Sequence, residues 1–453
     1  MRPSELLVGL DVGTTSCKAV VFDDAGVARS VGRAKTPWRQ VQPADPTGTA
    51  GTEMDAGALL LACVTAVHRA LAEAPPGRVA GLGVTSMAES GVLLDARGQP
   101  VVPVVAWHDA RDHIEVVELG RDLDENRFSS RTGLPYRSQW SLTKHRWQLA
   151  NDPQTAGATR RLSVAEWVVH ALGGDQASDA SLASRTGWLD LSARTWWGEA
   201  IAWSGASESL FPPLVTSGSA LGSVSSAAGV ARLTGAVLTT AGHDHQAAAV
   251  GAEAAGPGDQ LDSCGTAEAL VRTVTAGFPP AGVFRLAKGG VTVGWHVLDG
   301  RWALLGATEG GLELQRTLAT LGGPEALPSL DAAALGAIAH AGKTPPTRDP
   351  TRTAARSVAG KVSSGQVWKA ALEDITSRIH RIDHSITAVV GPYRSMVVTG
   401  GWSRSPALME VKRRTFGDLR RSDVEEAGAR GAALLAGVAA GIYAGINEFP
   451  RLS

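Results

Sequence analysis

Apolar and polar residues alternate along the first 25 positions in the pattern of a β-hairpin. One apolar run, LLVGL (6–10), leads into a polar turn, DVGTT (11–15), and a second apolar run, KAVVF (18–22), follows it. Two such runs around a glycine-containing turn are typical of paired antiparallel strands. The pattern leaves two interpretations open: an ordinary hairpin with a polar turn, or a turn that holds a ligand.

Helical and strand patterns alternate after this hairpin. DAGALLLACVTAVHRALAEA (55–74) has apolar residues at helical spacing, and RVAGLGVTSM (78–87) is typical of a strand. VLLDARGQPVVPVVAW (92–107) predicts two strands around a turn, and DHIEVVELGRDL (112–123) predicts a helix. This alternation predicts an α/β fold with helices packed on a mixed sheet.

The second half begins with the same kind of element as the first. The stretch 213–235, rich in Gly, Ser and Ala, is interpreted as a crossing between two domains, 1–235 and 236–453. AVLTTAGHDH (236–245) then predicts a new strand and a polar turn, and GDQLDSCGTAEALVRT (258–273) predicts a strand, a turn and another strand. We therefore expect two domains, which the length of 453 residues allows.

The remaining patterns extend the second domain. The stretch 289–308 predicts further hairpins, 365–390 a long helix, and RSMVVTG (394–400) a strand. The segment 425–445 predicts a helix made largely of Ala and Gly, which suits close packing against its neighbours.

Two turns separated by about half the chain share one pattern. LDVGTT (10–15) and LDSCGTAE (261–268) each place an aspartate and a Gly-Thr turn after an apolar strand. The backbone N–H groups of such turns, with the threonine hydroxyls, bind phosphate oxygens, and glycine lets the backbone approach closely. The repetition predicts two related domains whose turns face each other across a cleft, and it favours the ligand-holding interpretation of the first turn.

The net charge and the number of cysteines limit the kinds of molecule that this protein is expected to bind and the compartment in which it is expected to work. The formal net charge is −1, which argues against binding to nucleic acid or to an acidic membrane surface. The three cysteines are far apart and odd in number, as expected in a reducing cytoplasm without disulfides. The N-terminus does not resemble a signal peptide, and no unbroken apolar stretch is long enough to span a membrane. We expect a soluble cytoplasmic protein that binds small molecules.

Two local patterns imitate other sites. GAIAHAGKT (336–344) resembles a Walker A loop, but five residues rather than four separate its glycines, and no strand precedes it. The triplet His243-Asp244-His245 resembles a metal site, but no further histidine cluster supports it.

The motifs taken in order are similar to those of the FGGY family of carbohydrate kinases, in the superfamily of actin, hexokinase and the heat-shock chaperone ATPases. The resemblance covers nearly the whole chain. Its motifs are DVGTTSCKAVVFDDAG (11–26), SMAESGVLLDARGQP (86–100), AWHDAR (106–111), TKHRW (143–147), DASLASRTGWLDLSARTWW (179–197), AGHDHQAAAVGA (241–252), DSCGTAE (262–268), GKTPPTRDP (342–350), VWKAALED (367–374), TGGWSRSP (399–406) and EEAGARGAALLAG (425–437).

The resemblance implies two ribonuclease-H-like (actin-like ATPase) domains with ATP, Mg²⁺ and a sugar in the cleft between them, and a homodimer is common in the family. It also implies a role for each matching residue. Asp11 helps to hold Mg²⁺; Thr14, Thr15, Gly265 and Thr266 contact phosphates; Gly400, Gly401 and Ser403 form the adenosine loop; Trp107, Asp109 and Arg111 line the sugar pocket; Lys144 is the signature lysine; and Asp244 takes the proton from the attacking hydroxyl. Glu89 is expected at the same sugar pocket, although it does not match the family motif.

The sequence departs from the family pattern where the sugar would bind. Ala88-Glu89 stands where pentulose kinases usually carry Met-His, and His145 occupies a position that is normally apolar. If Glu89, Asp109 and Asp244 surround one pocket, an acidic sugar would be repelled. At an effective dielectric near 20, like charges ~4–5 Å apart cost roughly 3–4 kcal/mol.

The expected function is therefore ATP-dependent phosphorylation of a small neutral sugar, a ketopentose such as xylulose or a related polyol. One alternative is a kinase for gluconate or another sugar acid. Others are a non-catalytic sugar-sensing homologue, which the presence of both Asp11 and Asp244 disfavours, and a chaperone-like or filament ATPase.

Overall fold

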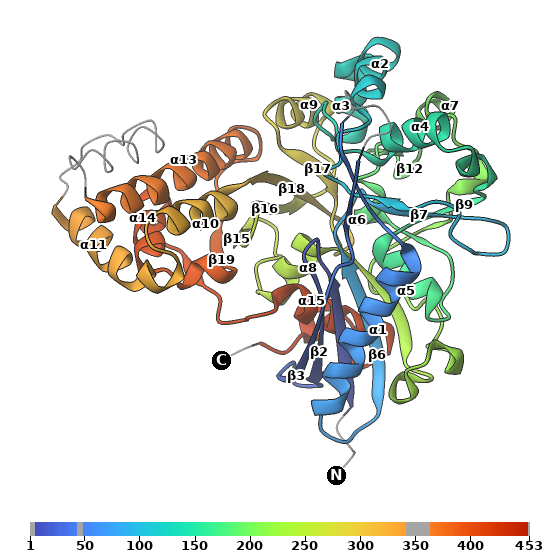
Figure 1. Cartoon of the computed structure of the whole chain (residues 1–453), viewed down its shortest axis with the longest axis horizontal. Coiled ribbons are helices and arrows are strands. Elements are labelled where there is room, and N and C mark those ends of the chain that lie inside the picture. Colours follow the sequence, from blue (N-terminus) through green and yellow to red (C-terminus); the bar gives the residue numbers. More distant parts are fainter. Residues whose placement is uncertain (1–4, 43–48, 341–362, 452–453) are drawn as a thin grey trace.

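The computed structural model describes residues 5–42, 49–340 and 363–451, and it contains two large mixed sheets (Figure 1). The first sheet has the strand order β14 (Val237–His243), β6 (Val79–Ser86), β1 (Leu6–Val12), β2 (Ser16–Asp23) and β3 (Ala28–Lys35). The second has the order β17 (Thr292–Trp295), β18 (Arg301–Thr308), β16 (Glu268–Thr275), β15 (Asp259–Cys264), β19 (Ser395–Thr399) and β20 (Arg420–Arg421).

Both predicted hairpins are present. β1 and β2 pair antiparallel, as do β15 and β16, and each pair has a parallel neighbour beside its first strand: β6 beside β1 and β19 beside β15. The turns at the ends of β1 and β15 therefore occupy equivalent places in the two sheets.

The helices of the described residues pack on the sheets or on one another. They are α1 (Ala56–Glu73), α2 (His113–Leu123), α3 (Glu125–Thr132), α4 (Ser141–Asn151), α5 (Val164–Ala171), α6 (Ala180–Ala183), α7 (Gly198–Ser204), α8 (Asp244–Gly251), α9 (Pro280–Lys288), α10 (Gly310–Thr320), α11 (Leu327–His340), α13 (Ser364–Val390), α14 (Pro406–Phe416) and α15 (Ala427–Ala439). Short strands form smaller sheets: β4 (Arg39–Val41) with β5 (Gly51–Met54) and β8 (Val104–Val105), β7 (Gly91–Leu94) with β9 (Arg160–Ser163), β10 (Ser178–Asp179) with β13 (Leu214–Val215), and β11 (Leu189–Asp190) with β12 (Thr195–Trp196).

The first sheet packs between α1 and α15. Alternate β1 residues point to opposite faces, so that Val8 joins the core formed with α1 and Leu7 joins the core formed with α15. Gly9 lets α15 approach closely, because a Cβ there would lie 1.8 Å from the Ala429 carbonyl oxygen. Among the described residues, α1 alone is long and apolar enough to cross a membrane, and its packing on β2 and β3 accounts for that composition.

Helices α8 and α15 lie between the two sheets (Figure 1). They pack through small residues, as predicted for the C-terminal segment: a Cβ at Gly431 would lie 1.9 Å from the Ala247 carbonyl oxygen. Their core includes Leu7 of the first sheet and Leu261 of the second, while α13 covers the other face of the second sheet. This shared core joins the two halves behind the turns.

The predicted domain boundary does not match the sheets. β14 pairs parallel with β6 and so belongs to the first sheet, although the sequence pattern assigned it to the second domain. The stretch 213–235 is consequently not the crossing: it contains β13 and turns that lead back to the first sheet. Of the Walker-like stretch, 336–340 belongs to α11, and 341–344 lies outside the described residues.

Candidate active site

A cavity of about 540 Å³ separates the two repeated turns. The first half contributes residues of the β1–β2 turn, the end of β6 and the start of α8, and the second half contributes the β15–β16 turn and the end of β18. Predicted site residues that line it are Asp11, Thr14, Thr15, Glu89, Trp107, Asp244, Gly265 and Thr266. The facing turns predicted from the sequence thus lie on opposite sides of one cleft.

The first turn is held in place by hydrogen bonds to its backbone and side chain. The Thr36 hydroxyl donates to the Gly13 carbonyl oxygen (2.7 Å), and the Trp38 indole donates to the Thr14 carbonyl oxygen (2.9 Å). The Trp107 indole donates to the Thr14 hydroxyl (3.0 Å), which links the expected phosphate turn to the expected sugar pocket. The Gly13 N–H donates to the Ser16 carbonyl oxygen (3.1 Å), so the N–H groups of this turn that remain for phosphate oxygens are those of Thr14 and Thr15.

The Asp11 carboxylate fits a cation-binding role. Its Oδ1 atom is buried and has no hydrogen-bond partner among the described residues. Burial, and then the charge of Asp244, raises the pKa of Asp11 to about 7. A buried carboxylate without a donor is costly unless a cation neutralises it, and oxygen ligands are those that Mg²⁺ prefers.

Asp244 begins α8, directly after β14. Its Oδ1 atom accepts a hydrogen bond from the His245 backbone N–H (2.7 Å) and lies 3.4 Å from His243 Nε2. Burial raises the pKa of Asp244 to about 7, and the charge of Glu89 adds to the rise. Both histidines are neutral at pH 7, because burial lowers the pKa of each, to about 4 for His245. They therefore do not neutralise the carboxylates of the cleft.

Glu89 faces the cavity from a strained backbone. Its φ is +66°, a left-handed conformation that costs a non-glycine residue of order 1–3 kcal/mol. The Ser141 hydroxyl (2.6 Å) and Arg161 Nη2 (3.0 Å) donate to its carbonyl oxygen and hold it there. Its side chain accepts from Arg185 Nε (2.8 Å), so it carries a neutralised rather than a free charge.

Arg185, Gln139 and Arg137 are among the cavity residues that were not predicted as site residues. Arg185 pairs with Glu89 and also donates to the Thr292 hydroxyl of β17, so it links the two halves of the chain. Gln139 donates to Glu89 Oε1 (3.1 Å). Arg137 lies over the Trp140 ring and forms no ion pair among the described residues. The motif around 179–197 contained Arg185, but its partner is 96 residues away and nothing local in the sequence indicates the pair.

Asp109 and Arg111 are not among the described residues that line the cavity. Asp109 accepts from the Thr52 backbone N–H (2.8 Å) and from Arg111, and Arg111 also pairs with Glu53 (2.8 Å). The buried Lys144 ammonium donates to the Asp109 carbonyl oxygen. These three residues anchor the loop that carries Trp107. Of the three carboxylates expected around one pocket, Asp109 is therefore outside the described lining, whereas Glu89 and Asp244 line the cavity together with Asp11 and Glu309. Because Glu89 is paired with Arg185, the repulsion argument no longer holds for the predicted set of three.

The Gly400, Gly401 and Ser403 loop lies behind the second turn, outside the set of described lining residues. Gly400 packs directly on that turn, since a Cβ there would lie 2.5 Å from the Cys264 carbonyl oxygen. The Ser403 hydroxyl donates back to the Gly400 carbonyl oxygen (2.7 Å). The first residues of α10 also contact the turn: Leu312 N–H donates to the Thr266 carbonyl oxygen (2.9 Å).

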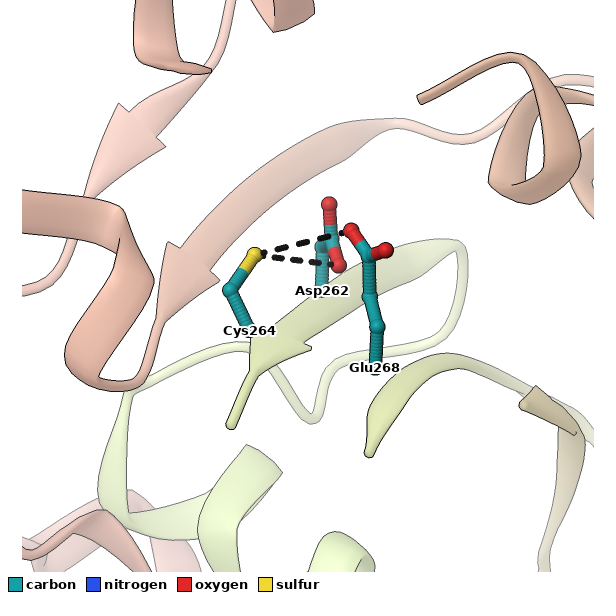
Figure 2. A group of neighbouring side chains, drawn as sticks. All are labelled: Asp262, Cys264 and Glu268. Carbon is teal, nitrogen blue, oxygen red and sulfur yellow. Dashed lines mark hydrogen bonds between the residues drawn. The ribbon is translucent and has the colours of Figure 1, made fainter. Parts of the chain in front are cut away.

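A buried cluster of charged side chains lies next to the second turn, on β15, β16 and α14. Figure 2 shows Asp262, Cys264 and Glu268 pointing toward one another, with Cys264 Sγ 3.6 Å from Asp262 and 3.7 Å from Glu268. These donor types suit a metal, but the fully buried Lys412 ammonium of α14 lies 2.5 Å from Asp262 and 2.6 Å from Glu268. The lysine occupies the place of a cation, so the cluster is a structural ion network.

Comparison with known proteins agrees with this geometry. A family model described as the N-terminal domain of the FGGY family of carbohydrate kinases matches residues 6–251. A glycerol kinase from Bordetella parapertussis is 28% identical, covering 99% of this chain and 91% of its own. One from Pseudarthrobacter chlorophenolicus is also 28% identical, covering 98% and 91%.

Solved structures share the fold. A xylulose kinase from Rhodospirillum rubrum has a TM-score of 0.81 at 22% identity, covering 98% of this chain and 92% of its own. A glycerol kinase from Plasmodium falciparum, solved with ADP, has a TM-score of 0.81 at 17% identity, covering 99% and 93%. The chain accordingly shares the fold of these carbohydrate kinases, as the sequence predicted.

Proposed function

The chain belongs to the FGGY family of carbohydrate kinases, and from that premise we propose that it transfers the γ-phosphoryl group of ATP to a hydroxyl of glycerol. The observation that carries the proposal is the pair of Gly-Thr turns facing each other across a cleft that also contains Asp11 and Asp244. An ATP-dependent kinase of a sugar or polyol needs such a site, because phosphoryl transfer depends on positioning and on neutralising phosphate charge.

In the proposed mechanism the two turns bind the phosphates and Asp244 accepts the proton of the attacking hydroxyl. A carboxylate with a pKa near 7 is suited to this step, since about half of it is deprotonated at neutral pH and it is basic enough to take a proton. Asp11 would hold Mg²⁺, which supplies charge neutralisation for the phosphates when bound. Trp107, and Glu89 with its partner Arg185, would orient the acceptor at the other end of the cleft.

Glycerol is favoured over a ketopentose by the relatives. The kinases that are 28% identical over almost the whole chain are named glycerol kinases, whereas the xylulose kinase likeness is one of fold at 22% identity. The expected preference for a ketopentose is thus replaced by a preference for a small polyol. We further propose a cytoplasmic location, which fits the three free cysteines, and a homodimer.

A sugar acid is the second candidate, favoured by one observation. Arg137 presents a guanidinium to the cavity without an ion pair among the described residues, while Glu89 is already neutralised by Arg185. A carboxylate on the acceptor would form a charge-assisted hydrogen bond with it.

The test is ADP release from ATP and Mg²⁺ with glycerol, xylulose, erythritol, glycerate and gluconate, each against a blank without acceptor. We expect glycerol to give the highest kcat/KM, and the matched variant Asp244→Asn to abolish that turnover while retaining ATP binding. Fast turnover of gluconate or glycerate alone would assign the second candidate, and it should then fall in Arg137→Gln. Activity of Asp244→Asn within tenfold of wild type would refute the proposed base.

A further inference from the structure

A second cavity, of about 630 Å³, lies at the opposite ends of the elements that build the cleft. α8 starts at Asp244 in the cleft, and Val250 near its end lines the second cavity. β15 starts at Asp259 in the second cavity, and Ser263 near its end lines the cleft. With a rise of about 1.5 Å per helical residue, α8 separates the two by roughly 10 Å. The second cavity is therefore a separate site.

The walls of this rear cavity come from the second sheet and from the two helices that lie between the sheets. α8 and α15 contribute Val250, Arg430 and Leu434, and the second sheet contributes β15, β19 and β20, including Asp259 and Arg420. The segment 446–451, which follows α15, completes the lining. A molecule bound here would touch the second sheet and the helices that join it to the first sheet.

The rear cavity is strongly basic. Five arginines line it but only two carboxylates, Glu253 and Asp259. The arginines are Arg301, Arg394, Arg420, Arg430 and Arg451.

The carboxylates pair with only two of these arginines. Arg394 lies 2.8 Å from Asp259, and Arg430 lies 3.5 Å from Glu253. Across the described ranges, no carboxylate lies within ion-pair distance of the other three arginines, which are Arg301, Arg420 and Arg451. The cavity therefore carries an excess of three positive charges, whereas the chain as a whole has a net charge of −1.

The hydrogen bonds of the arginines leave donors available. Arg301 Nη1 donates to the Ala255 carbonyl oxygen, and Arg420 Nη2 donates to the Ala252 carbonyl oxygen (3.0 Å). These bonds orient each guanidinium, which has five N–H donors, and use one of them. Arg430 Nε is buried without an acceptor among the described residues. Burial also lowers the pKa of Arg301 and of Arg430, and the charges of Asp259 and Glu253 oppose this shift without cancelling it.

We propose that the rear cavity binds a small phosphorylated compound, with its phosphate between Arg301, Arg420 and Arg451. Arginine is the side chain best suited to phosphate, because its planar fork makes two parallel charge-assisted hydrogen bonds. The volume lies in the range of small-molecule sites. The ligand would contact the second sheet and also α15, which packs on β1 and β6 of the first sheet, so its binding favours one relative arrangement of the two sheets and is thereby coupled to the cleft.

The test uses the full-length protein with inorganic phosphate as the probe and the cleft saturated with ADP and Mg²⁺. Thermal unfolding is followed as potassium phosphate is raised, against potassium chloride of equal ionic strength. We expect a saturable rise in Tm for wild type, and a midpoint at least tenfold higher in Arg420→Gln/Arg451→Gln. The matched control Arg97→Gln, an exposed arginine on the β7 side of the first domain, should keep the wild-type midpoint.

Both substituted arginines are exposed, so folding should be preserved. If the double variant unfolds, Arg451→Gln alone decides, with an expected midpoint at least threefold higher. The absence of a saturable rise in wild type beyond the chloride control would overturn the proposal. An unchanged midpoint in the arginine variants would overturn it as well, since it would assign phosphate binding to another part of the protein.

Discussion

The two Gly-Thr turns have the same local sequence pattern and opposite electrostatics. Asp11 of the first turn has a buried carboxylate oxygen without a partner, and its pKa is raised to about 7. Asp262, at the equivalent place in the second turn, contacts the Lys412 ammonium at 2.5 Å. The carboxylate of the first turn thus has no cation partner among the described residues, whereas that of the second turn is paired with Lys412 of α14.

This difference assigns different tasks to the two halves. Without a ligand, the first turn keeps the Asp11 carboxylate buried without a partner, and a divalent cation would offset the cost of burying this charge. The second turn has a fixed geometry: its ion network, Gly400 and the start of α10 all hold it in place. An unpaired carboxylate at the first turn and a second turn fixed by its neighbours suit an enzyme that binds a metal–nucleotide complex between the two turns.

Removing the base should have the largest effect. Asp244→Asn keeps the shape of the side chain but cannot accept the proton, so we expect kcat to fall by about 10²–10⁴-fold. ATP binding, measured by isothermal titration, should stay within about threefold of wild type. An unchanged kcat would place the base elsewhere.

The same variant should stabilise the unliganded protein. The pKa of Asp244 in the folded state lies above its ordinary value of 3.8, so its ionisation costs stability as the pH rises from about 4 to 7. Asn lacks this cost, and we expect the free energy of unfolding at pH 7.5 to rise by about 1–3 kcal/mol in urea titrations. A loss of stability would contradict the burial-based explanation.

The next largest effect is expected from removing the carboxylate charge of Asp11 in the first turn. Asp11→Asn should raise the Mg²⁺ concentration needed for half-maximal activity by at least about tenfold, because the variant lacks one charged ligand. Asp262→Asn is the matched variant in the second turn, and we expect it to leave the Mg²⁺ dependence unchanged while lowering stability. Equal Mg²⁺ dependence in the two variants would refute the distinction between the turns.

Breaking the second turn tests stability. Lys412→Met leaves Asp262 and Glu268 buried without their cation, and removal of one partner of a buried ion network typically costs about 3–5 kcal/mol. Lys369→Met is the matched control, since Lys369 forms a surface pair with Glu373 worth about 0.3–0.5 kcal/mol. Urea denaturation of both variants measures the difference, and comparable losses would mean that the cluster contributes little.

Local pattern was sufficient to predict the turns but not the charges around them. The hairpins, the helix at 56–73 and the convergence of Asp11 with Asp244 followed from strand patterns and from family motifs. β14 was assigned to the wrong half, because a strand's neighbours depend on chain topology that its own residues do not encode.

Ion pairs over long sequence separations account for the other errors. Lys412 meets Asp262 across 150 residues, and Arg185 meets Glu89 across 96. Asp109 looked as suitable for the pocket as Glu89 does, yet its partners Thr52 and Arg111 hold it in the adjoining loop. Whether an acidic side chain faces the cleft is decided by contacts of this kind, which a single sequence does not display.

The smallest expected effect is on the pH dependence of kcat/KM, which tests the role given to Asp11 in the first turn. In the unliganded enzyme the carboxylates of Asp11 and Asp244 titrate as a coupled pair with pKa values raised to about 7. The base must be deprotonated to act, so kcat/KM should fall about tenfold for each pH unit below that value. Mg²⁺ bound at Asp11 would favour the ionised forms, and saturating Mg²⁺ should therefore move the acidic limb to lower pH.

Glu268 also has a pKa raised to about 7, but it lies beside Lys412 and outside the cleft, so Glu268→Gln should leave this limb in place. Profiles of kcat/KM from pH 5 to 9 at two Mg²⁺ concentrations test this, and a limb that ignores Mg²⁺ would show that Asp11 is not the residue that holds the metal.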